Sequence, residues 1–237
     1  MHLGRVDTDT DALRERIILN NNSRYNLEDW IIEQAMLNHG EKILDLGCGT
    51  GKQLKVITEM FSVDAIGVDV SPGGLDFAND SITTVCASFD EIPVRGVFTR
   101  ILATYSIYYA KDMMTTIQAY REMLTPNGFM FLCGAADGTN TEVYSIVNEL
   151  LDEHPKLREK YGVRWTGDWI SSTQLDELLA DTTRLLNYVK FESADQVMNW
   201  WRHHNSYIPE LDEAVKVRLP VEGLELTKNV LGVRVKK

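Results

Sequence analysis

A glycine-rich segment at residues 43–51 has the residue types needed to hold a small polar ligand against the backbone. It reads ILDLGCGTG and places glycines at positions 47, 49 and 51. Glycine permits positive φ angles and lets backbone N–H groups approach a ligand closely. Asp45 stands two residues before the first glycine, where a carboxylate can meet an ammonium group. The pattern predicts a loop that binds a charged small molecule.

Three kinds of ligand-binding loop place glycines after a strand. A phosphate-binding loop requires GxxxxGK followed by Ser or Thr, but Leu46 lies five residues before Gly51 and Gln53 follows Lys52. A dinucleotide loop requires GxGxxG, and here Lys52 occupies the position of the third glycine. A loop that holds an amino acid joined to a nucleoside fits best, because it uses Asp45. A nicotinamide oxidoreductase stays an alternative.

A second carboxylate supports a nucleoside ligand. Asp69 lies in the apolar stretch 65–70, about twenty residues after the glycines, where a carboxylate can accept both ribose hydroxyls. Both the dinucleotide and the nucleoside interpretations require ribose recognition. Asp69 therefore predicts a nucleoside without choosing between them.

The elements that must position these residues alternate between strand-like and helix-like stretches, which is typical of a parallel sheet covered on both faces. We expect strands at 42–46, 65–70, 82–87, 99–105, 128–134, 184–191 and 226–235, with a turn at 126–128. Helices are expected at 26–39, 51–61, 71–79, 111–125, 140–161 with a break at Pro155, 172–180, 193–204 and 209–218.

ILDLGCGTG, the later GVDVS and the PNG turn together resemble class I S-adenosylmethionine-dependent methyltransferases of the small-molecule type. The resemblance implies an α/β fold: a Rossmann-like, doubly wound, seven-stranded sheet, mostly parallel with an antiparallel last strand and helices on both faces. Residues 1–237 would form one methyltransferase domain. It would carry an N-terminal helical cover (1–40), an inserted lid-like segment (136–170) and additional helices between the last two strands (193–219).

The resemblance also implies which residues hold S-adenosyl-L-methionine and its product S-adenosyl-L-homocysteine. The glycine loop would carry the methionine part, Asp69 the ribose, and Val70 would lie against the adenine. At the position where the family often has an acidic residue for the adenine amine, this sequence has Ser88, so the side chain of Ser88, the backbone of Phe89 and Asp90 are alternatives. The expected cofactor contacts are Tyr25, Asp45, Gly47, Cys48, Gly49, Gln53, Asp69, Val70, Ser88, Phe89 and Thr104.

The acceptor side is expected to use aromatic residues and histidines. Tyr108 and Tyr109 follow the fourth strand, and Trp165 and Trp201 are candidate walls of an acceptor pocket. If the acceptor is a hydroxyl it needs a base, for which the candidates are His203, His204 and Tyr108. An alternative of another class is a binding module that keeps the cofactor pocket without the chemistry.

The net charge and the cysteine content limit which classes of partner and which compartment we expect. The formal net charge of −11 opposes nucleic acid and anionic membranes as partners, so we expect a small-molecule acceptor. The three cysteines are separated, show no zinc-binding spacing, and fit a reducing cytosol, so we expect no metal and a cytoplasmic protein. The start of the sequence is too charged for a signal peptide. The oligomeric state is not predicted.

Overall fold

The computed structural model describes residues 15, 18–19, 22–71, 82–163 and 167–237. Two compact units form along the chain. We call residues Leu27–Gly134, Trp169–Leu185 and Leu231–Lys237 the sheet unit. The remaining residues, up to Asn26, Ala135–Asp168 and Leu186–Val230, form the hairpin unit. The helix expected at 71–79 lies, apart from Ser71, outside the described residues.

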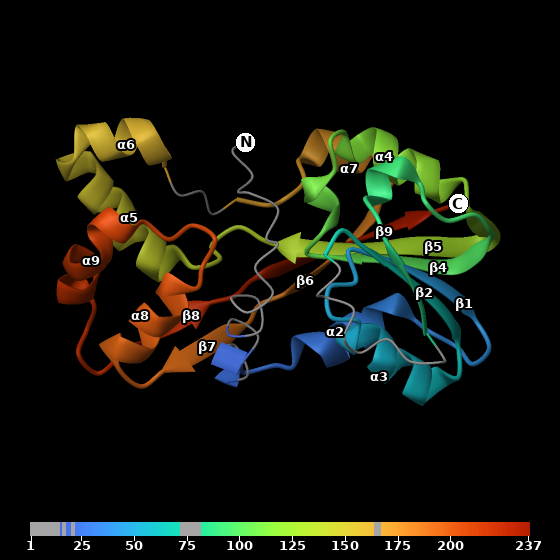
Figure 1. Cartoon of the computed structure of the whole chain (residues 1–237), viewed down its shortest axis with the longest axis horizontal. Helices are drawn as coiled ribbons and strands as arrows, with labels where there is room; N and C mark the ends of the chain where they lie inside the picture. The colour runs from blue at the N-terminus through green and yellow to red at the C-terminus, as the bar shows by residue number, and fades with distance from the viewer. Residues whose placement is uncertain (1–14, 16–17, 20–21, 72–81, 164–166) are drawn as a thin grey trace. The chain divides into compact units, whose positions relative to one another are not determined.

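The sheet unit is built on seven strands in the order β3-β2-β1-β4-β5-β9-β6 (Figure 1). β1 is central and pairs in parallel with β2 and β4, while β3 and β5 extend the parallel part outward. The predicted fold class is confirmed: a mostly parallel seven-stranded sheet with an antiparallel strand. The strands are β1 (Lys42–Leu46), β2 (Asp64–Asp69), β3 (Ile82–Cys86), β4 (Phe98–Thr104), β5 (Leu124–Ala135), β6 (Asp181–Leu185) and β9 (Val230–Lys236).

Helices lie on both faces of this sheet, with α2 and α3 on one side and α4 and α7 on the other (Figure 1). Their bounds are α2 (Leu27–Ala35), α3 (Lys52–Phe61), α4 (Met113–Arg121) and α7 (Ser172–Leu178), and the short 3-10 helices are η3 (Phe89–Glu91) and η4 (Ile107–Tyr109). α3 buries Leu54, Ile57 and Thr58, which lie on one helical face at i, i+3 and i+4. It begins directly after Gly51, so the glycine loop leads into a packed helix.

The turn expected at 126–128 is instead part of β5. The pairing of β4 with β5 is irregular there, because Phe98 lies opposite Leu124 while Arg100 lies opposite Phe129. β5 therefore carries extra residues between these two pairs, as in a bulge. Gly128 is needed at this point, since a Cβ on it would lie 2.9 Å from the Thr99 carbonyl oxygen.

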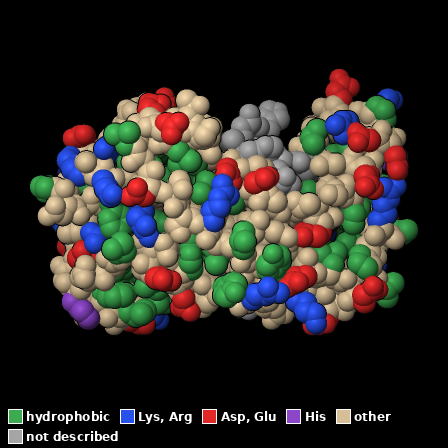
Figure 2. Space-filling model, turned by 180° about the vertical axis from the view of Figure 1, so that it is seen from behind, with side chains coloured by type: hydrophobic (Ala, Val, Ile, Leu, Met, Phe, Trp, Pro, Cys, Tyr) green, Lys and Arg blue, Asp and Glu red, His purple; other side chains and the backbone are tan. Residues whose placement is uncertain are grey.

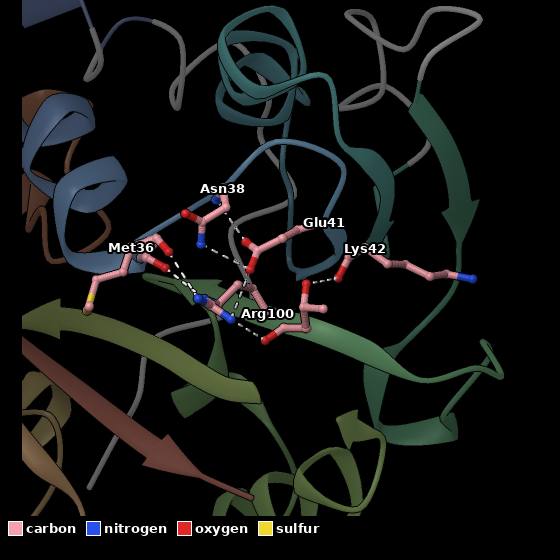
Figure 3. A network of polar contacts seen from close by, with 7 residues as sticks. Met36, Asn38, Glu41, Lys42 and Arg100 are labelled. Atoms are coloured by element: carbon pink, nitrogen blue, oxygen red, sulfur yellow. Dashed lines mark hydrogen bonds and ion pairs between the residues drawn. The ribbon is translucent and has the colours of Figure 1, made fainter. Parts of the chain in front are cut away.

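Buried Arg100 on β4 fastens the C-terminal end of α2 to the sheet (Figure 3). Its guanidinium donates to the carbonyl oxygens of Ala35 and Met36 and to that of Thr99, at 2.8–3.0 Å. It also pairs with the Glu41 carboxylate at 3.3 Å. α2 has no basic residue in its own last turn, so a strand supplies the positive charge that its C-terminal carbonyls favour.

The hairpin unit contains α5 (Thr141–Glu153), α6 (Pro155–Tyr161), α8 (Ala194–Arg202), η5 (Pro209–Leu211), α9 (Asp212–Arg218) and the antiparallel pair β7 (Tyr188–Phe191) and β8 (Leu224–Thr227). The break expected at Pro155 is confirmed, because α6 begins at that proline. Apolar side chains from α5, α8, α9 and the hairpin form one core, which includes the fully buried Trp200 and Trp201.

Two expected strands are each split. The stretch 184–191 gives the end of β6 and then β7, and the stretch 226–235 gives the end of β8 and then β9. Buried Asn187 lies between β6 and β7, where its side chain bonds the backbone N–H groups of Tyr25 and Tyr188 and the carbonyl of Tyr25. Side-chain bonds of this kind compete with a strand ladder, which explains the interruption.

Acidic and basic side chains are interspersed over the face drawn in Figure 2. Ion pairs form between such side chains; Arg218, for example, pairs with both Glu149 and Glu153. Within the described residues, every helix is too short or too polar to cross a lipid bilayer.

Candidate functional site

The glycine loop at the carboxyl end of β1 has the backbone that the sequence predicted. Gly47, Gly49 and Gly51 have φ angles of 75°, 55° and 76°, a region that side chains disfavour. The N–H groups of Gly47 and Cys48 donate to the Val68 carbonyl oxygen at 2.7 and 3.1 Å, which ties the loop to β2. Cys48 is buried against Gly67, and burial raises the pKa of its thiol, so this cysteine packs as a small neutral side chain.

Asp69 at the end of β2 joins this loop to the next one. One carboxylate oxygen accepts the Gly49 N–H at 2.8 Å, and the other accepts the Ser71 N–H at 2.8 Å. Each carboxylate oxygen can accept a further hydrogen bond. The residue expected to hold a ribose therefore also fixes the two loops around it.

Two buried polar atoms flank the glycine loop. Asp45 on β1 is 1% exposed, and Gln53 lies in the first turn of α3. Among the described residues, nothing donates to Asp45 Oδ1 and nothing accepts from Gln53 Nε2. Buried polar atoms without partners are uncommon and costly, and a ligand is one explanation for them. Asp45 Oδ1 is a hydrogen-bond acceptor and Gln53 Nε2 is a hydrogen-bond donor, so a ligand that met both would need a donor and an acceptor of its own.

Asp45 is also the most perturbed carboxyl group of the site. Burial, and then the negative charge of Asp69, raise the pKa of the Asp45 carboxyl from 3.8 to about 7. The site thus holds a carboxyl group whose pKa lies near neutral pH. A cation placed beside Asp45 would favour its ionised form.

The connection after β3 holds the residues expected near an adenine. The Ser88 hydroxyl accepts the Asp90 N–H at 3.2 Å and begins η3. The Asp90 carboxylate accepts the Lys111 N–H at 3.2 Å and the Thr116 hydroxyl at 3.4 Å, so it anchors the start of α4. The Ser88 hydroxyl and the Phe89 carbonyl oxygen also have partners, Asp90 and Tyr120, so Ser88, the Phe89 backbone and Asp90 all stay alternatives. Val70, after β2, is 42% exposed, as a cover for a ligand would be.

The end of β4 carries Thr104, an expected cofactor contact, followed by Tyr105 and Ser106, which the sequence did not predict as site residues. Thr104 Oγ1 donates to Gln53 Oε1 at 3.2 Å. Tyr105 has a left-handed φ of 56° and donates its N–H to the Cys133 carbonyl oxygen at 2.7 Å. Buried Ser106 donates its hydroxyl to the Leu46 carbonyl oxygen. A positive φ at a tyrosine cannot be predicted from the sequence. Only the position of these residues directly after the fourth predicted strand indicated that they lie near the site.

Beyond this segment, an aromatic group lies at the same edge of the sheet unit. The rings of Tyr108 and Tyr109 are 4.9 Å apart, and the ring of Tyr108 is 6.3 Å from that of Trp169. Gly134 lets them pack, since a Cβ there would lie 2.8 Å from both Tyr108 and Trp169. Trp169 is buried and donates its indole N–H to the Leu231 carbonyl oxygen.

The other expected site residues belong to the hairpin unit. Tyr25 is 53% exposed and bonds Asn187 through its backbone. Trp201 is fully buried and stacks on His204 at 5.9 Å. His203 follows α8, with Nδ1 2.8 Å from the Asn199 carbonyl oxygen. Trp165 lies outside the described residues.

The sequence of residues 43–128 matches a family model described as a methyltransferase domain. These residues thus have the sequence of a methyltransferase domain, which supports the class I S-adenosylmethionine-dependent family that the glycine loop resembles. This methyltransferase is 27% identical over 109 residues to malonyl-[acyl-carrier protein] O-methyltransferase of Priestia megaterium, covering 44% of the chain and 40% of that protein. It is 25% identical over 150 residues to ubiquinone biosynthesis O-methyltransferase of Bradyrhizobium diazoefficiens, covering 59% of the chain and 55% of that protein.

A solved structure shares the fold of this methyltransferase. Phosphoethanolamine N-methyltransferase 2 of Haemonchus contortus, in complex with S-adenosyl-L-methionine, matches with a TM-score of 0.57 and 16% identity, over 96% of this chain and 57% of that one. The chain thus spans 40% and 55% of the two named O-methyltransferases and 57% of this structure.

Proposed function

We propose that this methyltransferase transfers the methyl group of S-adenosyl-L-methionine to an oxygen or nitrogen nucleophile of a small-molecule acceptor. The observation that carries the proposal is the pair of unpartnered buried atoms beside the glycine loop, Asp45 Oδ1 and Gln53 Nε2. An amino-acid ligand carries an ammonium group and a carboxylate, which are the partners that these two atoms lack. A ligand with a pyrophosphate in their place would leave Asp45 facing negative charge.

The residues present therefore fit the cofactor. In this proposal Asp45 meets the ammonium group, Gln53 Nε2 donates to the carboxylate and Asp69 accepts from the ribose. Val70 covers the adenine, and Ser88, the Phe89 backbone or Asp90 meets its amine. Bound S-adenosylmethionine supplies an electrophilic methyl group on a positively charged sulfur.

The protein then has to position the acceptor and exclude water. Correct orientation of two reacting groups can lower a barrier by about 7–11 kcal/mol. An amine or a carboxylate needs little further help, whereas a hydroxyl needs a group that takes its proton. The two relatives are named as O-methyltransferases, which makes a hydroxyl or carboxylate acceptor a natural first class to test.

Of the two neighbouring histidines, the hydrogen bonds favour His203 as the base. A carbonyl oxygen only accepts, so His203 must donate its Nδ1–H to Asn199, which leaves a lone pair on Nε2. His204 instead accepts the Ser206 N–H at Nδ1, which places its own proton on Nε2. Neutral His203 can therefore take a proton at Nε2, and neutral His204 cannot.

We expect His203→Gln to lower kcat on a hydroxyl acceptor by about 100-fold or more, as for loss of a general base. His204→Gln is the matched control and should lower kcat much less. Steady-state kinetics on both variants, with affinity for S-adenosylhomocysteine measured alongside, make the comparison. Equal kcat in His203→Gln and wild type would remove His203 from the mechanism and favour an acceptor that needs no base, or Tyr108 in that role.

Cofactor binding and methyl transfer test the proposed function directly. Titration calorimetry should show binding of S-adenosylhomocysteine and no binding of NAD. Transfer of a labelled methyl group from S-adenosylmethionine should then be measured against a panel of small hydroxyl, carboxylate and amine acceptors. Binding without transfer to any panel member would favour a non-catalytic binding module, and binding of NAD alone would overturn the proposal.

A further inference from the structure

Three consecutive residues at the end of β4 each bond a different element of the sheet unit. Thr104 bonds Gln53 on α3 at 3.2 Å, Tyr105 bonds the Cys133 carbonyl on β5 at 2.7 Å, and Ser106 bonds the Leu46 carbonyl on β1. We call residues 104–106 the β4 clamp. Two of these bonds reach Gln53, whose Nε2 lacks a partner, and Leu46, the residue after Asp45.

Thr104 determines which way the Gln53 amide faces. With Oε1 held by the Thr104 hydroxyl, Nε2 is the end of the amide that remains buried without a partner. Without that bond, the amide can rotate and present its oxygen instead, which would repel a carboxylate. Thr104 thus acts on a ligand through Gln53.

Ser106 holds the first turn of the glycine loop. Its hydroxyl bonds the carbonyl of Leu46, the residue between Asp45 and Gly47. Its Cβ fills the space in front of Gly47, where an added Cβ would lie only 2.4 Å away. Ser106 is 6% exposed, so this contact is packed as well as bonded. Tyr105, between the two bonded side chains, has a left-handed φ of 56°, a conformation that costs free energy at a residue other than glycine.

We infer that Thr104 and Ser106 are positioning residues, which hold Gln53 and the Asp45–Gly47 turn in the arrangement that binds the amino-acid part of the cofactor. The inference rests on the proposed function for the identity of that ligand. The ordering of the loop itself does not depend on any ligand.

The test compares Ser106→Ala and Thr104→Val with Thr99→Val. Thr99 is a matched control, because its hydroxyl also bonds a carbonyl of β1, that of Lys42, at 3.0 Å, but at the opposite end of β4. Calorimetry should show S-adenosylhomocysteine binding about tenfold weaker in Ser106→Ala and in Thr104→Val, as for loss of one hydrogen bond. Thr99→Val should bind like wild type, and Thr104→Ser should restore most of the affinity.

Two further measurements separate positioning from general damage to the fold. In a Gln53→Leu background, Thr104→Val should cause no additional loss of affinity, because its effect passes through Gln53. In ligand-free protein, the amides of Gly47 and Cys48 should exchange with solvent about tenfold faster in Ser106→Ala than in Thr99→Val.

Equal affinities in all variants and unchanged exchange would overturn the inference, as would an equal loss of affinity in Thr99→Val. If wild-type protein binds no S-adenosylhomocysteine, the proposed function fails. The exchange comparison then still decides whether Ser106 orders the loop.

Discussion

Asp45→Asn is expected to stabilise the ligand-free protein and to weaken S-adenosylhomocysteine binding about a hundredfold or more. The folded-state pKa of Asp45 is raised to about 7 from 3.8. A carboxyl group with a raised pKa holds its proton more tightly in the folded than in the unfolded state. Stability is therefore lost as the pH rises from about 4 to about 7, and the whole loss is present above pH 7.

The size of that loss follows from the shift in pKa. A pKa difference of about three units lowers the free energy of unfolding by at most about 4 kcal/mol at pH 8. Asparagine has nearly the same shape and cannot ionise, so Asp45→Asn should recover about 2–4 kcal/mol of unfolding free energy at pH 8 and little at pH 4. Urea unfolding at the two pH values measures the difference.

Asp45→Asn should also bind S-adenosylhomocysteine more weakly, because removing one charge of a buried charge pair costs about 2–5 kcal/mol of binding free energy. Binding of an ammonium group to wild type should also lower the pKa of Asp45 and release part of a proton near pH 7. Calorimetry in buffers of different ionisation enthalpy detects this release, which should disappear in Asp45→Asn.

Asp69→Asn is the matched control for this prediction. Both Asp69 oxygens accept loop N–H groups, and an amide can accept at only one end. This variant should lose about 1–2 kcal/mol of unfolding free energy at pH 4, and less at pH 8, where removing the Asp69 charge also lowers the pKa of Asp45. A fall in stability for both variants would show that Asp45 carries no raised pKa.

The parallel part of the sheet was readable from sequence because each strand there is short, apolar and bounded by a turn or a helix start. The predicted strand 42–46 coincides with β1, and the predicted strand 82–87 ends one residue beyond β3. The glycines, Asp45 and Asp69 were readable for a similar reason, since their spacing along the chain fixes which strand ends they occupy.

The features that were missed depend on contacts between distant residues. The bulge at Gly128 requires the Thr99 carbonyl on another strand, and a local PNG pattern reads equally as a turn. The division of 184–191 requires Asn187 to bond Tyr25, which is 162 residues away in sequence. Ser106 and Tyr105 donate hydrogen bonds to the carbonyl oxygens of Leu46 and Cys133, and the residue types Tyr and Ser alone do not predict such bonds.

Arg100→Met is expected to lower the unfolding free energy of the sheet unit by about 3–5 kcal/mol, as for one half of a buried ion pair. The variant leaves the Ala35, Met36 and Thr99 carbonyl oxygens without their donor. It also leaves the Glu41 carboxylate, which is 13% exposed, without its cation. Methionine fills much of the same volume, so the loss would reflect the missing donors and charge.

Three companion variants separate these causes. Glu41→Gln combined with Arg100→Met should recover about 1–2 kcal/mol, because it removes the stranded charge and keeps an oxygen for the Asn38 N–H. Arg100→Lys should fall between wild type and Arg100→Met, since an ammonium keeps the charge but cannot match the fork geometry of three carbonyls. Arg234→Met removes the bonds of another arginine to α2, at Gln34, and should cost only about 1 kcal/mol.

Urea unfolding and hydrogen exchange over Leu27–Ala35 provide the readouts. If Arg100→Met costs no more than Arg234→Met, and exchange in α2 is unchanged, then Arg100 does not anchor the helix. In that case α2 would be held by its apolar face alone, of which the contact between Trp30 and Phe131, with ring centroids 5.8 Å apart, is one part. A large loss for Arg100→Met that Glu41→Gln partly reverses would instead show that one buried cation on β4 both ends α2 and fixes it to the strand that carries the β4 clamp at its other end.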